Sequence, residues 1–322
     1  MKPAATLTVR VSRKQNEAVD IDSFELLAED GAALPSFSAG SHIDVHLPGG
    51  FVRQYSLCNN PSESHRYLIA VLRDANSRGG SQAMHDSVKE GDTLQISAPR
   101  NHFTLAHDAQ RHILLAGGIG VTPILCMAER LKSTAASFEM HYATRSRERT
   151  AFETRILESG VGEHVKFYFD DGAPADKLAL EPLLSQPKAG VHVYVCGPKG
   201  FMDAVLASAR RLGWPESQLH YEFFAAEVAL SPDAGSFEVQ VASTGQIILV
   251  PKDKTVAQAL ADSGIDIQTS CEQGVCGTCL TRVIEGIPDH KDLYLTPEEH
   301  ALNDQFLPCC SRAKSPRLVL DI

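Results

Sequence analysis

The stretch Cys271-Glu-Gln-Gly-Val-Cys276-Gly-Thr-Cys279 contains three cysteines, with four residues between the first two and two residues between the second two. A further pair, Cys309-Cys310, begins thirty positions after the last of them. Three cysteines at this spacing, with a distant fourth, match the ligand pattern of plant-type [2Fe-2S] clusters. The sequence therefore predicts four thiolate ligands, at Cys271, Cys276, Cys279 and Cys309.

The residues between these cysteines suit a loop that wraps closely around a small group. Gly274 and Gly277 permit sharp backbone bends, and the small side chain of Thr278 lets the backbone approach. A structural zinc site is the alternative, but zinc loops usually bring their cysteines two by two, whereas the distant pair here is adjacent. Cys310 is the alternative fourth ligand. The 29-residue gap after Cys279 and the Ser-Arg-Ala-Lys that follows the pair favour Cys309.

Composition limits the kinds of protein to consider. The chain has 322 residues, of which 43% are hydrophobic and 22% charged, and its net charge of -10 argues against nucleic acid as a partner. No signal peptide or long apolar segment is evident, so we expect no membrane span and a cytoplasmic protein whose cysteines stay reduced. Residues 236–322 hold 7 Lys and Arg against 12 Asp and Glu, a balance of -5. This acidic end suits docking on a basic surface, or is simply a solvated face.

The cysteine stretch resembles the C-terminal ferredoxin domain of the phthalate dioxygenase reductase family, which supplies electrons to Rieske-type oxygenases. The resemblance extends along the chain and implies several domains. We expect an antiparallel β-barrel flavin domain over residues 1–105, an α/β parallel-sheet nucleotide domain over 106–226, a linker at 227–235 and a β-grasp ferredoxin domain over 236–322.

Alternating apolar residues predict short antiparallel strands in the first domain, typical of a barrel. The alternation is found at Leu7-Val9-Val11, Phe24-Leu26, Ile43-Val45-Leu47 and Tyr67-Ile69-Val71.

The same domain carries two short motifs that suit the binding of a phosphate-bearing aromatic ligand. In Arg53-Gln-Tyr55-Ser56, the guanidinium can pair with a phosphate, and Tyr55 shares its face of the strand. Glycines before a predicted helix through Met84 leave backbone amides open to an anion. Arg73 closes the strand that leads into this turn.

Together these motifs resemble the flavin site of the ferredoxin-reductase family. The resemblance implies Arg53 on the flavin phosphate or ring edge, Tyr55 against the isoalloxazine and Ser56 near its reactive nitrogen. It also favours FMN over FAD and implies a phosphate site at the turn, formed by Arg73, Gly79, Gly80 and Ser81.

The second domain begins with Arg111 to Ala116, a strand that ends in a continuous apolar run, as expected for a strand buried on both faces. Gly118 and Gly120 follow it, and Thr122-Pro123 predicts the N-cap and first residue of a helix. Further strands at 139–143, 165–169 and 191–195 predict a parallel sheet. The last is followed by Cys196-Gly197-Pro198, at the edge where open sheets bind ligands.

In the family, these two loops frame the nicotinamide nucleotide, with the cysteine near the nicotinamide. Asp170 and Asp171, after the third strand of the domain, suit the ribose hydroxyl of NADH, whereas Arg145 argues for NADPH; the resemblance favours NADH, with Asp171 as the candidate ligand. Phe224 aligns with the aromatic residue that covers the flavin face in relatives. An ordinary packing role is the alternative for it.

The third domain is predicted to have strands at 237–241, 247–250, 281–284 and 318–320 and a helix at 255–262, which fits a β-grasp fold. Asp289 and His290 lie between the cysteine segments and are interpreted as part of a solvated loop, with a docking surface as the alternative. The thirteen histidines show no metal-ligand spacing such as His-x3-His with a Glu.

The order of the domains describes an electron relay from NADH through FMN to a [2Fe-2S] cluster and a Rieske oxygenase. Nicotinamide gives up two electrons as hydride, a cluster carries one, and flavin connects the two. We therefore expect the reductase component of a two-component oxygenase, monomeric in isolation, with catalytic roles for Ser56, Cys196 and Phe224. A stand-alone flavin reductase or NADH oxidase and a low-turnover redox sensor are the alternatives.

Overall fold

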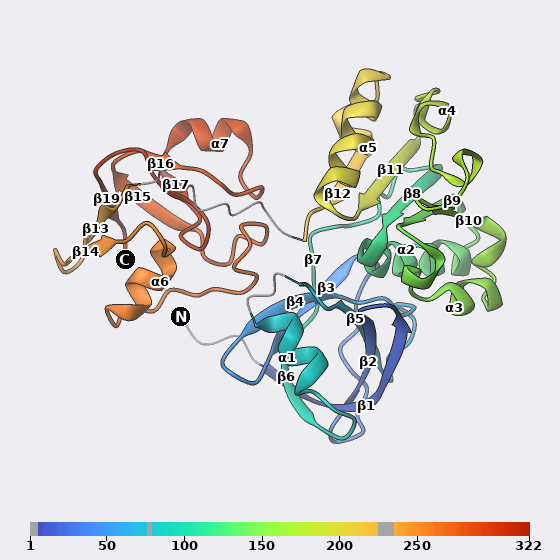
Figure 1. The fold of residues 1–322 in the computed structure, drawn as a ribbon, viewed down its shortest axis with the longest axis horizontal. Coiled ribbons are helices and arrows are strands. Elements are labelled where there is room, and N and C mark those ends of the chain that lie inside the picture. The colour runs from blue at the N-terminus through green and yellow to red at the C-terminus, as the bar shows by residue number, and fades with distance from the viewer. Residues whose placement is uncertain (1–5, 76–78, 225–234) are drawn as a thin grey trace. The chain divides into compact units, whose positions relative to one another are not determined.

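The structure is a computed structural model that describes residues 6–75, 79–224 and 235–322. The chain divides into two compact units, Met1–Glu222 and Phe223–Ile322 (Figure 1). The predicted linker at 227–235 lies outside the described residues except for Gly235. Each unit is therefore considered by itself.

The first sheet is antiparallel throughout, with the strand order β4-β3-β6-β1-β2-β5 and with β7 beside β3. The apolar residues of the predicted alternation point into its core, and β4 and β5 at the two ends also contact each other. The sheet therefore curls into an antiparallel half-barrel, close to the antiparallel barrel that the alternation predicts. Its elements are β1 (Thr6–Ala18), β2 (Ile21–Ala28), β3 (Ser41–His46), β4 (Val52–Ser56), β5 (Tyr67–Leu72), α1 (Gly80–Asp86), β6 (Thr93–Ser97) and β7 (Arg100–Asn101).

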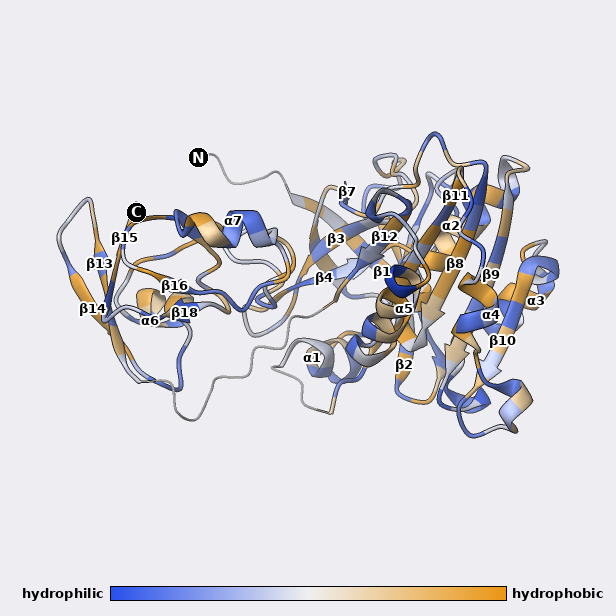
Figure 2. Ribbon diagram, turned by 90° about the horizontal axis from the view of Figure 1, so that it is seen from above, coloured by the Kyte–Doolittle hydropathy of each residue, from blue (hydrophilic) through white to orange (hydrophobic). Residues whose placement is uncertain are grey.

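The second sheet of this unit is parallel, in the order β10-β9-β8-β11-β12. Its central strand β8 is buried from its second residue onward and is mostly hydrophobic in Figure 2. Burial on both faces explains the continuous apolar run of the sequence. Its elements are β8 (Arg111–Gly117), α2 (Val121–Ser133), β9 (Ser137–Thr144), α3 (Glu153–Glu158), β10 (Val165–Phe169), α4 (Leu180–Leu184), β11 (Val191–Cys196), α5 (Lys199–Arg211) and β12 (Leu219–Glu222).

The start of α2 differs from the prediction. A short 3-10 helix, Gly118–Gly120, runs directly into α2, whose N-cap is Gly120. Thr122 lies inside the helix, and its hydroxyl donates to the carbonyl of Ile119 at 3.1 Å. The prediction of Thr122 as N-cap was wrong because the tight turn orders the backbone before the threonine is reached.

The second unit contains a five-stranded sheet in the order β14-β13-β19-β15-β17 and a small β16-β18 pair. Helix α6 begins at a capping box between Thr255 and Gln258, and its buried residues join the sheet in one core. This mixed sheet with its helix confirms the ferredoxin fold. Its elements are β13 (Phe237–Val241), β14 (Ile247–Val250), α6 (Val256–Asp262), β15 (Thr281–Glu285), β16 (Pro288–Asp289), α7 (Pro297–Leu302), β17 (Gln305–Phe306), β18 (Arg312–Ala313) and β19 (Arg317–Leu320).

Four further 3-10 helices connect these elements, at Arg147–Arg149, Gly162–His164, Pro174–Asp176 and Glu216–Gln218. Within the part of the chain that the structure describes, every helix is too short or too polar to cross a bilayer.

Candidate functional site

The four predicted cluster ligands lie close together in the second unit. Hydrogen bonds join the thiols of Cys271 and Cys276, and those of Cys279 and Cys309. Cys271, Cys279 and Cys309 are buried, Cys276 is half-buried, and none of the chain's cysteines is in a disulfide. A converged set of four thiols, mostly shielded from water, is the donor set that a [2Fe-2S] cluster requires.

The backbone of the cysteine loop bends as the glycines predicted. Gly274 and Gly277 have φ of 72° and 70°, in the left-handed region that side chains disfavour. A Cβ atom at Gly277 would also overlap the ring of Tyr294. The amide of Gln273 donates to the sulfur of Cys271 at 3.3 Å, an interaction that stabilises a thiolate. The loop therefore fits a cluster held by thiolates.

Cys309 and Cys310 occupy different surroundings. Cys309 shares a hydrogen bond with Cys279, a member of the loop. The sulfur of Cys310 lies 3.6 Å from the carbonyl of Leu307 and would be 2.6 Å from a Cβ atom placed on Gly274. Cys310 therefore packs against Gly274 and shares a hydrogen bond with Cys309, whereas Cys309 itself contacts Cys279 of the loop directly, an arrangement that favours Cys309.

In the first unit, strand β4 and the start of α1 bring two predicted flavin-binding segments together. Arg53 extends along the backbone at Gly80, where an added Cβ atom would come within 2.6 Å of the arginine side chain. Gly79 precedes the helix with φ of 90°. A guanidinium beside the amides of a helix start is a suitable cradle for a phosphate.

The neighbours of Arg53 on β4 are arranged as the strand pattern requires. Tyr55 packs against the half-barrel core, and burial raises the pKa of its hydroxyl. Ser56 ends the strand and is buried. Ser81 accepts a hydrogen bond from the amide of Asp74 at 3.2 Å. Arg73 forms an ion pair with Asp86 at 2.8 Å.

The two predicted nucleotide loops touch at the carboxyl edge of the parallel sheet. A Cβ atom at Gly120 would overlap the carbonyl oxygen of Cys196, so only glycine allows this approach. The ring of Phe201, on α5, would lie 2.8 Å from a Cβ atom placed on Gly117 or Gly197. The loops therefore form one rigid edge over which an extended ligand can lie.

Three side chains meet at this edge from β4, β11 and β12. Cys196 lies opposite Glu222 in the parallel register, and Ser56 donates to the Glu222 carboxylate over a long 3.5 Å. Burial raises the pKa of the Glu222 carboxyl to about 8. Burial, followed by the charge of Glu222, raises the pKa of the Cys196 thiol well above its ordinary value. At neutral pH all three groups are therefore uncharged and can donate hydrogen bonds.

Comparison with known proteins places this arrangement in a family. Two family models match: the 2Fe-2S iron-sulfur cluster binding domain over residues 239–314, and the dimethylamine monooxygenase subunit DmmA-like N-terminal domain over residues 96–219. The chain is 55% identical to a vanillate O-demethylase oxidoreductase of Pseudomonas putida, over 97% of this chain and 98% of that protein. It is 51% identical to the vanillate O-demethylase oxidoreductase of Pseudomonas sp. (strain HR199 / DSM 7063), over 98% of this chain and 100% of that protein.

A solved structure agrees with these sequence relatives. Phthalate dioxygenase reductase, described as a modular structure for electron transfer from pyridine nucleotides to [2Fe-2S], has a TM-score of 0.83 and 38% identity to the chain. The match covers 99% of this chain and 98% of that one. The chain belongs to the phthalate dioxygenase reductase and vanillate O-demethylase oxidoreductase family. It is therefore an NAD(P)H-dependent flavin and [2Fe-2S] oxidoreductase of the kind that serves oxygenases as their reductase subunit.

Within this family reductase, the structure brings together most of the residues that the sequence indicated. Arg53 lies with Gly80, Gly120 with Cys196, and the four cluster cysteines lie with one another. The amide of Asp171 donates to the carbonyl of Arg145 at 3.1 Å, so the two opposing candidates for the ribose site are neighbours. Phe224 follows β12 at the start of the second unit, and its role at the flavin stays a prediction.

Two residues of the reductase were not singled out from sequence. Glu222 precedes Phe223-Phe224 at the end of a strand, and a carboxylate at the carboxyl end of a parallel strand is a recognisable feature. No sequence feature identified Phe201, because its contact with Gly117 and Gly197 depends on how α5 packs.

Proposed function

We propose that this chain is the NADH-dependent reductase component of a two-component Rieske oxygenase, with FMN in its half-barrel domain and one [2Fe-2S] cluster in its ferredoxin domain. The observation that carries the proposal is the convergence of Cys271, Cys276, Cys279 and Cys309 in a chain that also has a nucleotide edge at Cys196. A hydride donor and a one-electron carrier in one chain define a relay.

The flavin would be held by the segment Arg53 to Ser56 and by the turn at Gly79, Gly80 and Ser81. When bound, flavin supplies a group that takes up hydride and passes electrons on singly. The guanidinium of Arg53 offers fixed donors to a phosphate, and the glycines leave room for it. A site with one guanidinium and one short helix start suits the single phosphate of FMN.

The nicotinamide nucleotide would lie along the edge formed by Gly118 to Gly120 and Cys196 to Pro198. The close backbone approach of these loops fixes their amides, so that a bound nucleotide is positioned without rearrangement. The Asp171 carboxylate would accept a hydrogen bond from the ribose 2'-hydroxyl of NADH and would repel the 2'-phosphate of NADPH. We propose NADH for this reason. Phe224 would cover the flavin until the nicotinamide enters.

Glu222 and Ser56 would control charge where hydride is transferred. At neutral pH the Glu222 carboxyl holds its proton, because burial raises its pKa to about 8. The neutral carboxyl adds no negative charge beside a ring that is gaining electrons, and the Ser56 hydroxyl lies within reach of it. Cys196, likewise neutral and fully buried, would add no charge to this edge.

The partner would be an oxygenase that acts on a methoxylated aromatic acid such as vanillate. The vanillate O-demethylase oxidoreductases at 51% and 55% identity over nearly the full chain support this choice. The acidic ferredoxin portion, with its balance of -5, would meet a basic face of that partner. A thiolate-bound cluster and a pyridine nucleotide suit the reducing cytoplasm, where we place the protein.

An anaerobic titration with NADH, followed by visible absorbance and electron paramagnetic resonance, tests the relay. We expect the flavin absorbance to bleach and one reduced [2Fe-2S] signal per chain to appear. A Cys279→Ser variant should keep the bleaching and lose the signal. Bleaching without an iron signal, in protein with two irons per chain, would instead indicate a stand-alone flavin reductase.

Mixing with purified oxygenases tests the partner. We expect electron delivery to a vanillate-type oxygenase to be faster than to a phthalate-type oxygenase at equal concentration. Slow turnover with every acceptor, cytochrome c included, would favour a redox sensor.

A further inference from the structure

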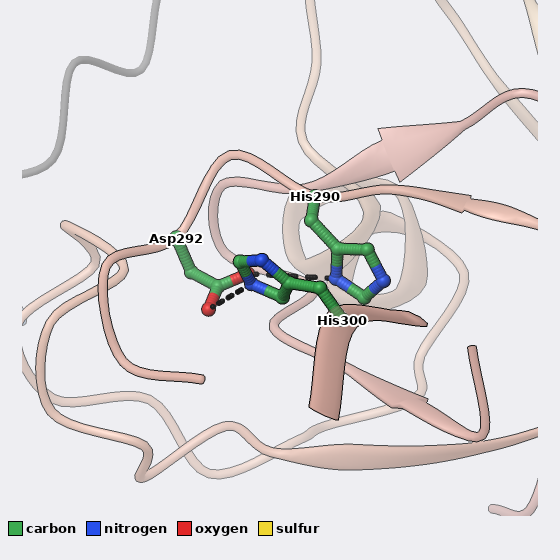
Figure 3. A group of neighbouring side chains, drawn as sticks. All are labelled: His290, Asp292 and His300. Atoms are coloured by element: carbon green, nitrogen blue, oxygen red, sulfur yellow. Dashed lines mark hydrogen bonds and ion pairs between the residues drawn. The ribbon is translucent and has the colours of Figure 1, made fainter. Parts of the chain in front are cut away.

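Three metal-ligating side chains that are not among the four predicted cluster ligands meet in the second unit, where the backbone of Asp292 lies beside Gly274 of the cysteine loop. His290 follows β16, Asp292 lies in the next loop and His300 is on α7 (Figure 3). His290 Nδ1 lies 3.7 Å from Asp292 Oδ1, and His300 Nε2 lies 3.1 Å from Asp292 Oδ2. One ligand atom from each residue lies within 4.8 Å of the others.

His290 is the unusual member of this group. Its side chain is only 8% exposed, and within the described part of the chain neither ring nitrogen makes a hydrogen bond of normal geometry, although the side chain of Asn303 lies near enough to interact weakly. The interpretation of this segment as a solvated loop was therefore wrong for His290, which is packed inward. A buried imidazole with only a weak hydrogen-bond partner is costly, and its Nδ1 faces the Asp292 carboxylate.

The donor set and its spacing suit a first-row divalent metal. Two imidazole nitrogens and a carboxylate oxygen form a common protein site for zinc and similar ions. Ligand atoms at about 2.1 Å from a tetrahedral ion are about 3.4 Å apart. The observed separations are close to this value, 3.7 Å to Oδ1 of Asp292 for His290 and 3.1 Å to Oδ2 for His300, but they involve different carboxylate oxygens, so the side chains have to adjust to share one ion.

We propose that His290, Asp292 and His300 form a binding site for a divalent transition-metal ion, of which Zn²⁺ is the representative, distinct from the four-cysteine site. The inference does not depend on the proposed oxygenase partner. The three side chains would occupy three positions of a tetrahedral ion, and water the fourth.

Asp292 is held in place as a metal ligand must be. Its side chain is fully buried, accepts hydrogen bonds from the amide of Leu295 at 3.0 Å and the hydroxyl of Ser311 at 3.2 Å, and cannot turn away. Burial opposes its ionisation, but the Leu295 amide and His300 outweigh that effect and hold the pKa of Asp292 below its usual value. The carboxylate is therefore charged and oriented.

His300 provides the entrance to the site. Its side chain is 28% exposed, whereas the other two are nearly or fully buried. The rings of His290 and His300 are stacked with centroids 4.2 Å apart and planes 24° apart. To coordinate an ion in its own plane, the His300 ring has to rotate about its side-chain bonds, and its partial exposure gives it room to do so.

Zinc binding to the full-length protein tests the proposal. Holoprotein with two irons per chain, so that the cysteines are occupied, is treated with a chelator, desalted and titrated with Zn²⁺ in a calorimeter. Bound zinc is then counted by elemental analysis. We expect one zinc per chain in the unaltered protein and at least about a 100-fold loss of affinity in a His300→Ala variant.

A second variant separates metal binding from a merely structural ion pair. His300→Arg keeps a hydrogen-bond donor opposite Asp292 but supplies no metal ligand. It should fold with an unchanged cluster spectrum and still lose zinc. His65→Ala, at an exposed histidine of the other unit, should bind zinc as the unaltered protein does. Absence of zinc in the unaltered protein, or retention of zinc by His300→Arg, would overturn the proposal.

Discussion

The cysteine loop and the nucleotide edge solve the problem of holding a cofactor in different ways. Cys271, Cys276 and Cys279 lie within nine residues, and a single distant segment completes the set. The nucleotide edge instead combines the end of β4, the loop after β8, the loop after β11 and the end of β12. A metal cluster needs specific atoms as ligands, whereas a nucleotide needs backbone amides, space and a neutral surface.

Substitutions should therefore have different effects at the two sites. A cluster ligand is defined by its sulfur atom, so replacing that atom removes the cofactor. A residue at the nucleotide edge is defined by shape or charge, so its replacement changes affinity, rate or pH dependence by degrees.

The adjacent cysteines give the largest expected contrast. Cys309→Ser should lose the cluster, because it removes a ligand. The rate of NADH-driven cytochrome c reduction should then fall by more than about 100-fold, the upper range for substitutions that only remove a hydrogen bond to a ligand. Cys310→Ser should keep two irons per chain, because its sulfur packs against Gly274 and the carbonyl of Leu307. Iron analysis and the visible spectrum measure both variants. If Cys310→Ser lost the cluster and Cys309→Ser kept it, Cys310 would be the fourth ligand and Cys309 the packing residue.

Gly120→Ala tests the contact between the two nucleotide loops. Its Cβ atom would overlap the backbone carbonyl of Cys196, which cannot move aside as a side chain can. We expect a loss of about 1–3 kcal/mol in the free energy of unfolding and a higher KM for NADH. Gly200→Ala on α5 is the matched control, since no heavy atom lies within 4 Å of its added Cβ. Equal stability of the two variants in denaturant titrations would contradict a tight loop contact.

Glu222→Gln tests the charge at the nucleotide edge. With a pKa of about 8, Glu222 is mostly protonated at pH 7 and about one-tenth protonated at pH 9. Flavin reduction by NADH should therefore slow by up to about tenfold between these values, and the glutamine variant should lose this dependence while matching the unaltered protein at pH 7.

The same substitution changes how stability depends on pH. Between about pH 4.5 and 8 the folded protein keeps the Glu222 proton that the unfolded chain releases, so stability falls as pH rises through this window. Glu222→Gln should remove that decline in thermal unfolding. Glu216→Gln, at an exposed carboxylate paired with Arg210, is the control and should leave the rate profile unchanged. If the stability of the Glu222→Gln variant still declined with rising pH, another titrating group would be responsible for the decline.

Asp171→Asn tests coenzyme choice, where the expected effect is smallest. Asp171 is exposed, and loss of its charge should lower the preference for NADH over NADPH by about tenfold, a difference of about 1.4 kcal/mol. Asp170→Asn, one residue earlier, is the control. The ratio of kcat/KM for the two coenzymes measures the change, and a larger effect in the Asp170 variant would move the ribose site by one residue.

The sequence alone determined features that depend on near neighbours along the chain. Cysteine spacing indicated the cluster loop, alternation predicted the strands of the half-barrel, and the run Ile113 to Ala116 predicted a strand buried on both faces. Each of these features is local: the spacing of ligands in a loop, the alternation of a strand and a buried apolar run all involve residues only a few positions apart. The error at Thr122 was also local: the 3-10 turn at Gly118–Gly120 started the helix before the expected cap.

Only the tertiary structure decided which distant residues meet. Glu222 pairs with Cys196 because β11 and β12 lie in parallel register, and burial there raises the pKa of the glutamate. His290, Asp292 and His300 lie within eleven positions, but they meet only because α7 folds back over the loop after β16. Such groupings depend on how strands, loops and helices pack, and packing is a property of the whole chain that no short stretch of sequence encodes.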